Sequence, residues 1–161
     1  MPIPKKVISF LEKNGLPYEV VAHRTVYTAY DLAQTLKAKL QEIAKTLLVK
    51  VDREYFLVIV PAHYKLDVSK VKKLFRAKKV SIASEGEMKR KFKVKPGAMT
   101  AFGTVHTVGV VMDKALLKAQ KVLFGAGSFT ESVRMKVKDF IKLEGDNVQT
   151  AVIAKRDPKK K

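Results

Sequence analysis

The sequence contains no cysteine, which excludes disulfide bonds, a thiolate nucleophile and any cysteine-ligated metal site. Histidine is scarce as well. His23, His63 and His106 are scattered along the chain and lack the i, i+4 spacing of a helical metal site. We therefore expect a protein that uses neither a metal nor another cofactor.

Long hydrophobic runs are also missing. The longest apolar stretches, residues 46–51 and 55–62, are interrupted by Lys50 and by the charged residues 52–54, and neither approaches the roughly 20 residues of a membrane-spanning helix. The first residues, 1–6, lack the apolar segment and cleavage site of a secretory signal. We expect a cytoplasmic protein that does not enter a membrane.

Acidic residues are few. The chain has 15 Asp and Glu and 33 Lys and Arg, which gives a net charge of +18. Such an excess is typical of proteins that bind polyanions, nucleic acid first among them. The alternative is a lysine-rich solvated surface, as some heat-adapted proteins have. Such a surface would be expected to contain more Asp and Glu residues, as partners for the lysines, than this chain has. The basic residues cluster at positions 70–79 and 89–95, and the candidates for nucleic-acid contact are Lys70, Lys73, Arg76, Lys78, Lys79, Lys89 and Arg90.

The positions of helix-capping and turn residues along the chain predict alternating helices and hairpins. Gly15 is placed to end a first helix at residues 5–14, Thr28 and Asp67 to begin others, and Ser84 with Glu87 forms the pattern of a capping box. Further helices are expected at residues 29–36, 68–75, 85–92 and 137–143 with a helical turn at 114–118, and strands at 18–22, 46–51, 55–60, 80–83, 108–112, 121–124 and 133–136.

This order predicts a mixed α/β domain with a largely antiparallel sheet and flanking helices, because hairpins alternate with single helices. A chain of 161 residues suits one domain, which we expect to span residues 1–154. Residues 155–161 would form a basic C-terminal tail. The sequence shows no obvious exposed apolar stripe that would be buried by a second copy of the chain, so we expect a monomer.

Two places carry most of the chemical information. Lys45 lies in the apolar run of residues 43–49, and a later loop is bounded by Gly97 and Gly103. A cation beside a core strand, with a loop that offers backbone N–H donors, suits an anionic substrate with a carbonyl group. The alternatives are a lysine whose stem covers the core while its head reaches water, and glycines that serve only a turn.

A series of motifs runs through nearly the whole chain. They are His23 with Thr28-Ala29 and Ala33, Lys45-Thr46-Leu47, residues 55–61, Leu66-Asp67, Ser84 with Glu87, residues 97–103, the Val-rich strand that ends at Asp113, Gly125-Ala126-Gly127, and Asp139 before Phe140. In order and spacing they resemble the YbaK and prolyl-tRNA synthetase-associated editing-domain family, which deacylates mischarged tRNA.

The resemblance implies how the chemistry is divided. Lys45 would bind the acceptor end of tRNA, and the loop with Gly97, Ala101 and Gly103 would hold the aminoacyl carbonyl. A water, helped by a ribose hydroxyl of the terminal adenosine, would attack the ester while loop amides and the lysine stabilise the negative charge. Substrate contacts are expected from His23, Tyr27, Thr28, Thr46, Thr100, Phe102, Gly127, Ser128 and Phe129.

Several of these residues have simpler explanations that stay open. Thr28 also serves as a helix cap, and His23 can pack under the neighbouring loop. Tyr27 and Tyr30 can stack on the terminal adenine or join the core. The implied partner is tRNA, through its acceptor stem and CCA end, with prolyl-tRNA synthetase as a second candidate.

Two positions depart from the family pattern. The family loop ends in proline where this chain has Ala101, so we expect loop amides that are less preorganised. Editing members often carry a histidine after the glycine-rich turn, where this chain has Phe129. The first hypothesis is a trans-editing deacylase for tRNAPro that carries alanine or cysteine. The second is a catalytically weak module that binds the acceptor stem, and the third is a docking role beside a synthetase.

Overall fold

The computed structural model describes residues 2–93 and 99–158. The helices are α1 (Lys5–Asn14), α2 (Ala29–Leu36), α3 (Val68–Phe75), α4 (Glu85–Phe92), α5 (Gly103–His106) and α6 (Val137–Glu144), with 3-10 turns at η1 (Leu40–Glu42), η2 (Lys114–Lys118) and η3 (Gly145–Asn147). Within these described ranges, no helix is long and apolar enough to cross a bilayer.

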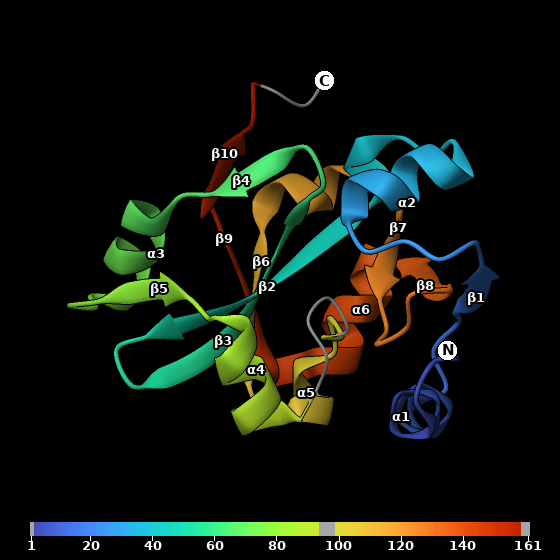
Figure 1. The fold of residues 1–161 in the computed structure, drawn as a ribbon, viewed down its shortest axis with the longest axis horizontal. Helices are drawn as coiled ribbons and strands as arrows, with labels where there is room; N and C mark the ends of the chain where they lie inside the picture. The colour runs from blue at the N-terminus through green and yellow to red at the C-terminus, as the bar shows by residue number, and fades with distance from the viewer. Residues whose placement is uncertain (1, 94–98, 159–161) are drawn as a thin grey trace.

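The strands are β1 (Glu19–Ala22), β2 (Ala44–Val51), β3 (Glu54–Pro61), β4 (Tyr64–Leu66), β5 (Val80–Ile82), β6 (Gly109–Asp113), β7 (Lys121–Gly125), β8 (Glu131–Lys136), β9 (Val148–Ala151) and β10 (Ala154–Arg156). A five-stranded sheet has the order β5-β2-β3-β6-β9, a three-stranded sheet has the order β1-β8-β7, and β4 pairs with β10 (Figure 1). Only the β3–β6 and β6–β9 pairings are parallel among the pairings of these named strands. The predicted mixed, largely antiparallel α/β fold is confirmed.

The central strands of the five-stranded sheet, β2, β3 and β6, carry buried residues on both faces. Alternate residues of β3 point in opposite directions, so Leu57 and Ile59 join the core shared with β7, β8, α1 and α6. Val58 and Val60 join a second cluster, which packs under α3 and the β4–β10 ribbon. Because both faces are covered, the sheet is a rigid support for whatever lies at the ends of its strands.

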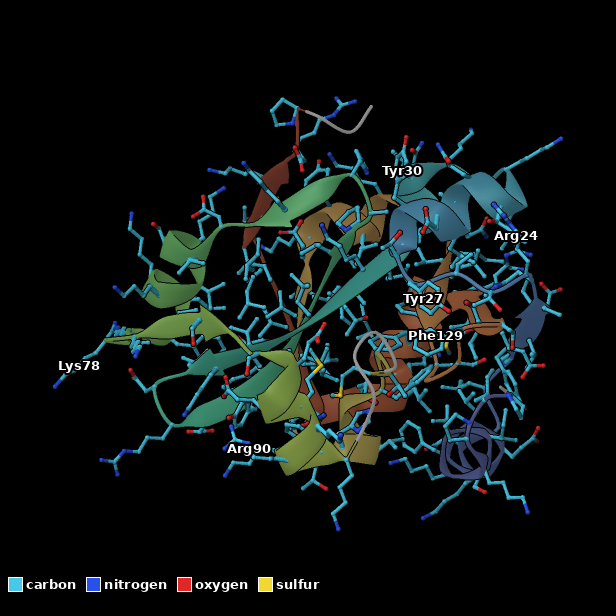
Figure 2. The ribbon with its side chains drawn as sticks, in the orientation of Figure 1. Arg24, Tyr27, Tyr30, Lys78, Arg90 and Phe129 are labelled. Atoms are coloured by element: carbon cyan, nitrogen blue, oxygen red, sulfur yellow. The ribbon has the colours of Figure 1, made fainter. Side chains whose placement is uncertain are left out.

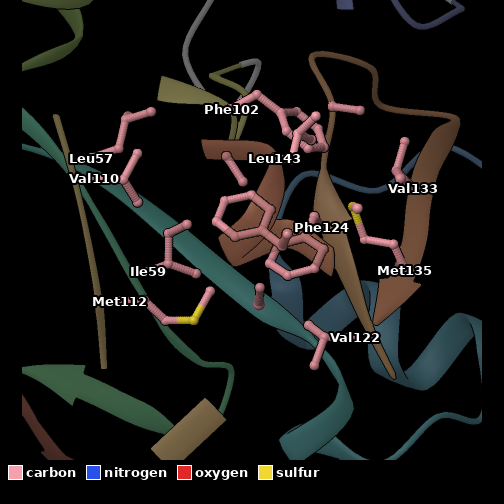
Figure 3. Close-up of a cluster of buried hydrophobic side chains, with 14 of the residues drawn as sticks. Leu57, Ile59, Phe102, Val110, Met112, Val122, Phe124, Val133, Met135 and Leu143 are labelled. Atoms are coloured by element: carbon pink, nitrogen blue, oxygen red, sulfur yellow. The ribbon is translucent and has the colours of Figure 1, made fainter. Parts of the chain in front are cut away.

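An aromatic stack closes the main core. The rings of Phe124 on β7 and Phe140 on α6 lie parallel, with centroids 4.4 Å apart and an interplanar angle of 9°. Figure 3 shows Phe124 lying opposite Ile59 and Met112, which come from β3 and β6. The two sheets therefore share one hydrophobic core.

The helix ends follow the local signals in the sequence. Gly15 ends α1 with φ of 65°, and the Thr28 hydroxyl accepts a hydrogen bond from the Asp31 N–H at 3.0 Å. Ser84 and Glu87 form the expected capping box at the start of α4. These helices begin and end where capping predicts.

The C-terminal region differs from the expectation. Lys155 and Arg156 pair with Lys65 and Tyr64 in the β10–β4 ribbon, so ordered structure continues past the expected start of the basic tail at residue 155. The physical reason is Asp113, whose buried carboxylate accepts the N–H groups of Ile153 and Ala154 at 2.9 and 3.0 Å and anchors the chain ahead of β10. Strands β4, β9 and β10 and helix α5 were not predicted.

Phe124→Ala tests the aromatic stack. We expect the free energy of unfolding to fall by about 3–5 kcal/mol, because the substitution leaves a cavity between the two sheets. Denaturant titration measures the change. Val152→Ala is the control, since Val152 is 56% exposed and its truncation should change stability by no more than about 0.5 kcal/mol. Equal effects of the two substitutions would contradict the shared core.

Candidate functional site

A pocket of about 280 Å³ lies where α2 approaches the first residues of β2 and the β7–β8 hairpin. Leu32 of α2 packs there with Ile43 and Leu123, which form an isolated parallel bridge between the start of β2 and β7. The pocket is lined by Val26, Tyr27, Thr28, Ala29, Leu32, residues 44–47, Met99, Gly125, Ser128 and Ser132. Segments far apart in the sequence thus meet at one end of the buried strand β2.

Lys45 and Thr46 are the polar contribution of β2 to the pocket. Lys45 lines the pocket, and its ammonium donates to the carbonyl of Tyr64, a residue outside the lining, at 2.5 Å. The Thr46 hydroxyl is buried and has no hydrogen-bond partner among the described residues. A buried hydroxyl without a partner costs about 1–3 kcal/mol, so a substrate group that reaches it gains a hydrogen bond that the protein alone does not supply.

Tyr27 and Phe129 form an aromatic pair at the pocket. Tyr27 lines the pocket and is 67% exposed, and its ring centroid lies 5.0 Å from that of Phe129. Figure 2 shows the two labelled side chains next to each other. The Val26 N–H donates to the Phe129 carbonyl at 2.9 Å, so this contact also fixes the segment before α2. Tyr30 lies farther along α2 and does not line the pocket.

His23 reaches the pocket through Ser132. Its Nε2 lies 2.9 Å from the Ser132 hydroxyl oxygen, and its Nδ1 lies 2.8 Å from the Arg24 carbonyl oxygen. Ser132 is 4% exposed and belongs to the pocket lining. The sequence pointed to His23 but not to Ser132, because a serine beside an expected strand carries no local signal of the side it faces.

Part of the predicted glycine loop is described. Gly97 lies outside the described residues, whereas Met99 lines the pocket. The N–H of Ala101 donates to the Gly125 carbonyl at 2.9 Å, a bond that proline cannot make because it has no N–H. The bond fixes the backbone at Ala101, and the expectation that the loop amides are less preorganised stays a prediction.

Thr100 is held by a histidine that received no role in the sequence analysis. Its hydroxyl lies 2.9 Å from Nε2 of His106 and accepts the Phe102 N–H at 3.1 Å. Thr100 is 1% exposed and is not among the residues that line the pocket, so its hydroxyl makes hydrogen bonds within the loop. The loop is thus shaped by its own side chains.

Phe102 and Gly103 lie in the core. The Phe102 ring is fully buried and lies 5.6 Å from that of Phe140, so it packs behind the pocket and not beside a substrate. A Cβ on Gly103 would lie 2.4 Å from a Val110 methyl and 2.5 Å from the Val108 carbonyl oxygen. Close packing alone therefore requires glycine at position 103.

Of the predicted residues in the turn after β7, Ser128 lines the pocket and Gly127 has a structural role. Ser128 lines the pocket, and its hydroxyl accepts the N–H groups of Thr130 and Glu131, both at 3.1 Å. Gly127 has φ of 86°, which favours glycine, and a Cβ there would lie 3.2 Å from Pro4 and from Thr100. The predicted residues that line the pocket are Tyr27, Thr28, Lys45, Thr46 and Ser128.

Comparison with known proteins identifies the domain. A profile of the aminoacyl-tRNA editing domain family matches residues 23–143, which include the whole pocket lining. The chain belongs to this family. The resemblance inferred from the motifs is confirmed, and membership supports an editing role for this domain.

The editing domain is similar in sequence to part of prolyl-tRNA synthetases. It is 30% identical to proline–tRNA ligase of Macrococcus caseolyticus over 71% of this chain and 20% of that protein. It is 32% identical to the enzyme of Staphylococcus saprophyticus over 62% of this chain and 16% of that protein. The chain spans only a small part of the length of these relatives.

Solved structures share the fold of the editing domain. A hypothetical protein superposes with a TM-score of 0.85 at 21% identity, over 94% of this chain and all of that one. A protein provisionally assigned as a trans-editing enzyme for prolyl tRNA synthetase gives a TM-score of 0.80 at 22% identity, over 96% of this chain and 99% of that one. At these identities the likeness establishes the fold alone.

The predicted nucleic-acid contacts of the editing domain lie away from the pocket. In Figure 2 Lys78 is at the left end of the molecule and Arg90 at its lower edge, whereas Tyr27 and Phe129 lie in the other half. Lys79 and Arg90 line a separate hollow of about 540 Å³ with Lys50, Lys91, Asp52, Tyr55, Ser81, Ser84 and Glu87. Lys70, Lys73 and Arg76 lie on α3 and at its C-terminal end, and Lys89 lies on α4.

The acidic residues of this hollow are engaged within the protein. The Asp52 carboxylate accepts the N–H groups of Lys78 and Lys79 at 3.0 and 2.9 Å, and the Tyr55 hydroxyl donates to Glu87 at 2.5 Å. This hydrogen bond lowers the pKa of Glu87, which keeps the carboxylate charged. None of the hollow's basic residues forms an ion pair with a described carboxylate. The surface is suited to bind an external polyanion.

The His106 contact predicts a loss of stability in acid. Burial, with the charge of Lys6 as a smaller cause, lowers the pKa of His106 from 6.5 to about 4. Between these values the unfolded chain binds a proton at this position and the folded chain does not, so the free energy of unfolding should decrease as the pH falls through this range. Denaturant titrations across the range measure it.

His106→Gln is the matched variant, because its amide keeps an acceptor for Thr100 and does not titrate. We expect a weaker dependence of stability on pH in the variant. The slope that remains contains opposed contributions, because burial lowers the pKa of His63 and raises the pKa of Glu144, so the difference between wild type and variant is the test of His106. Identical slopes in wild type and variant would refute the assignment to His106.

Proposed function

We propose that this editing domain is a deacylase that hydrolyses the ester of mischarged tRNA, most directly tRNAPro that carries alanine or cysteine. The observation that carries the proposal is the meeting of Lys45 and Thr46 with the Met99 end of the glycine loop in one small pocket. The similarity to proline–tRNA ligases supports the choice of tRNA.

The size of the pocket favours a small aminoacyl group. About 280 Å³ is at the lower limit of ordinary ligand sites, which begin near 300 Å³, so the terminal adenosine and the aminoacyl group do not both fit inside it. Apolar walls from Val26, Leu32 and Met99 suit a short side chain, and steric exclusion of a larger one gives sharper selection than a missing methylene. In this proposal the exposed Tyr27 ring would stack on the adenine.

Lys45 supplies the charge in this proposal. Its ammonium, held by the Tyr64 carbonyl, stabilises the negative charge that develops on the ester oxygen or holds the nearby phosphate. Backbone N–H groups of the glycine loop would share that charge. The Ala101 N–H is not one of them, because it is bonded to Gly125.

Lys45→Ala tests the enzyme. We expect hydrolysis of tRNAPro charged with alanine or cysteine to slow by about 10²–10³-fold, the usual effect of removing one charge-stabilising donor. The panel should include seryl-tRNAPro and prolyl-tRNAPro, with release of the amino acid followed over time. Wild type should spare the prolyl species.

Lys142→Ala is the control, because Lys142 is an exposed lysine on α6 outside the pocket and the basic hollow. Its rate should equal that of wild type, and both variants should keep the thermal unfolding midpoint within a few degrees. If wild type hydrolyses no charged tRNA of the panel, the proposal is wrong.

Thr46→Val separates substrate binding from stability. The substitution keeps the shape of the side chain and removes a buried hydroxyl that lacks a partner, so we expect the free energy of unfolding to stay level or rise by about 1 kcal/mol. If the hydroxyl bonds the substrate, kcat/KM should fall while stability does not. A stable variant with unchanged kcat/KM would remove Thr46 from the site.

The hollow lined by Lys50, Lys79, Arg90 and Lys91, the basic hollow, favours a second candidate function. This is a module that binds the acceptor stem of tRNA and has little catalytic activity. Lys50 lies on the same strand as Lys45, five residues on, which is about 17 Å at about 3.3 Å per residue. That separation lets one tRNA contact both places. Tight, salt-sensitive tRNA binding without hydrolysis would favour this function over the deacylase.

A further inference from the structure

The His23–Ser132 contact has the geometry of a catalytic base and a hydroxyl. The Ser132 oxygen lies 2.9 Å from Nε2 of His23, and Nδ1 of the same ring lies 2.8 Å from the Arg24 carbonyl oxygen. A hydroxyl, a histidine and an orienting acceptor in sequence are the arrangement by which proteins activate an oxygen nucleophile. Here Ser132 is one of the residues that line the proposed aminoacyl pocket.

The Arg24 carbonyl determines the tautomer of His23. A carbonyl oxygen only accepts hydrogen bonds, so Nδ1 must carry the hydrogen in the neutral ring. Nε2 then presents a lone pair, and the Ser132 hydroxyl must be the donor in the 2.9 Å contact. The ring is therefore oriented to take a proton from the Ser132 hydroxyl.

The strand pairing holds this geometry in place. Ser132 pairs with Val21 of β1 and with Gly125 of β7, and the His23 N–H donates to the Thr130 carbonyl at 2.9 Å. Gly125 itself lines the pocket. Both members of the pair are thus fixed by backbone hydrogen bonds within the three-stranded sheet, and a rigid support is what a catalytic pair needs.

We propose that Ser132 and His23 form a proton relay that activates the water attacking the aminoacyl ester. The proposal rests on the proposed deacylase function and adds to it a protein group that handles the proton. Because the water is activated by the protein, the ribose hydroxyl of the terminal adenosine is not required as the sole base.

Each proton that moves in the relay can be followed through the reaction. As the water oxygen bonds to the ester carbon, one water proton passes to the Ser132 oxygen and the Ser132 hydroxyl proton passes to Nε2 of His23. When the tetrahedral intermediate collapses, the bond from carbon to the ribose oxygen breaks. The proton then returns from His23 through Ser132 to that oxygen, and the products are the free amino acid and tRNA with an intact ribose hydroxyl.

Ser132→Ala and His23→Ala test the relay on the deacylation reaction. General-base catalysis contributes about 10²–10⁴-fold, so both variants should lose at least about 100-fold in kcat with little change in KM. The double variant should be no slower than the slower single one, because the two groups act as a unit. Ser132→Thr keeps a hydroxyl and should retain most of the rate.

Ser69→Ala is the matched control, since Ser69 is an exposed serine on α3, outside both the pocket and the basic hollow. The readout that a purely structural contact would not give is chemical rescue. Added imidazole should restore part of the rate of His23→Ala, because the half-buried ring leaves a space open to solvent, and it should not restore Ser132→Ala.

The outcomes separate the relay from the function on which it rests. If wild type deacylates the panel while Ser132→Ala and His23→Ala keep wild-type kcat, or if imidazole fails to restore His23→Ala, the relay is refuted and the deacylase stands. Trapping of an aminoacyl group on Ser132 in a rapid acid quench would also overturn it, because the hydroxyl would then attack the ester itself. If wild type has no activity, the proposed function fails first.

Discussion

The position of the pocket depends on the register of β2. Ala44 and Leu48 pack into the core shared by the two sheets, Val49 and Val51 pack under α3, and Ile43 packs against α2. A shift of one residue would exchange the two faces and bury charged side chains, so burial on both sides fixes the pairing with β3. Lys45 and Thr46 are held in place by hydrophobic contacts in which their own side chains take little part.

The described side of the pocket is built from rigid parts. Segments from α2, β2 and the β7–β8 hairpin each carry few polar groups, and those groups are oriented by backbone partners, as Lys45 is by Tyr64 and His23 by Arg24. Thr46 is the exception, since its buried hydroxyl has no described partner. In the proposed function a group of the substrate would supply that partner.

Local signals made much of the fold predictable, and long-range contacts account for what was missed. Thr28 and the Ser84–Glu87 capping box act within one helical turn, so the sequence places those helix starts closely. Strand β10 depends on Asp113, whose carboxylate binds the chain 40 residues later, and no local pattern contains that information. The same limit applies to the pocket lining: Lys45 stands out as a cation in an apolar run of the sequence, whereas no local pattern indicates that Ser132 reaches the pocket.

Gly125 connects the parts of the site that the sequence keeps apart. Its carbonyl accepts the Ala101 N–H, it pairs with Ser132, and it lines the pocket. Ala101 of the glycine loop and Ser132 are therefore both joined to the same residue. Alanine makes this bond possible, because proline, which the resemblance leads one to expect at position 101, has no N–H to donate to Gly125. Ala101 thus provides a hydrogen bond between the loop and a residue that lines the pocket.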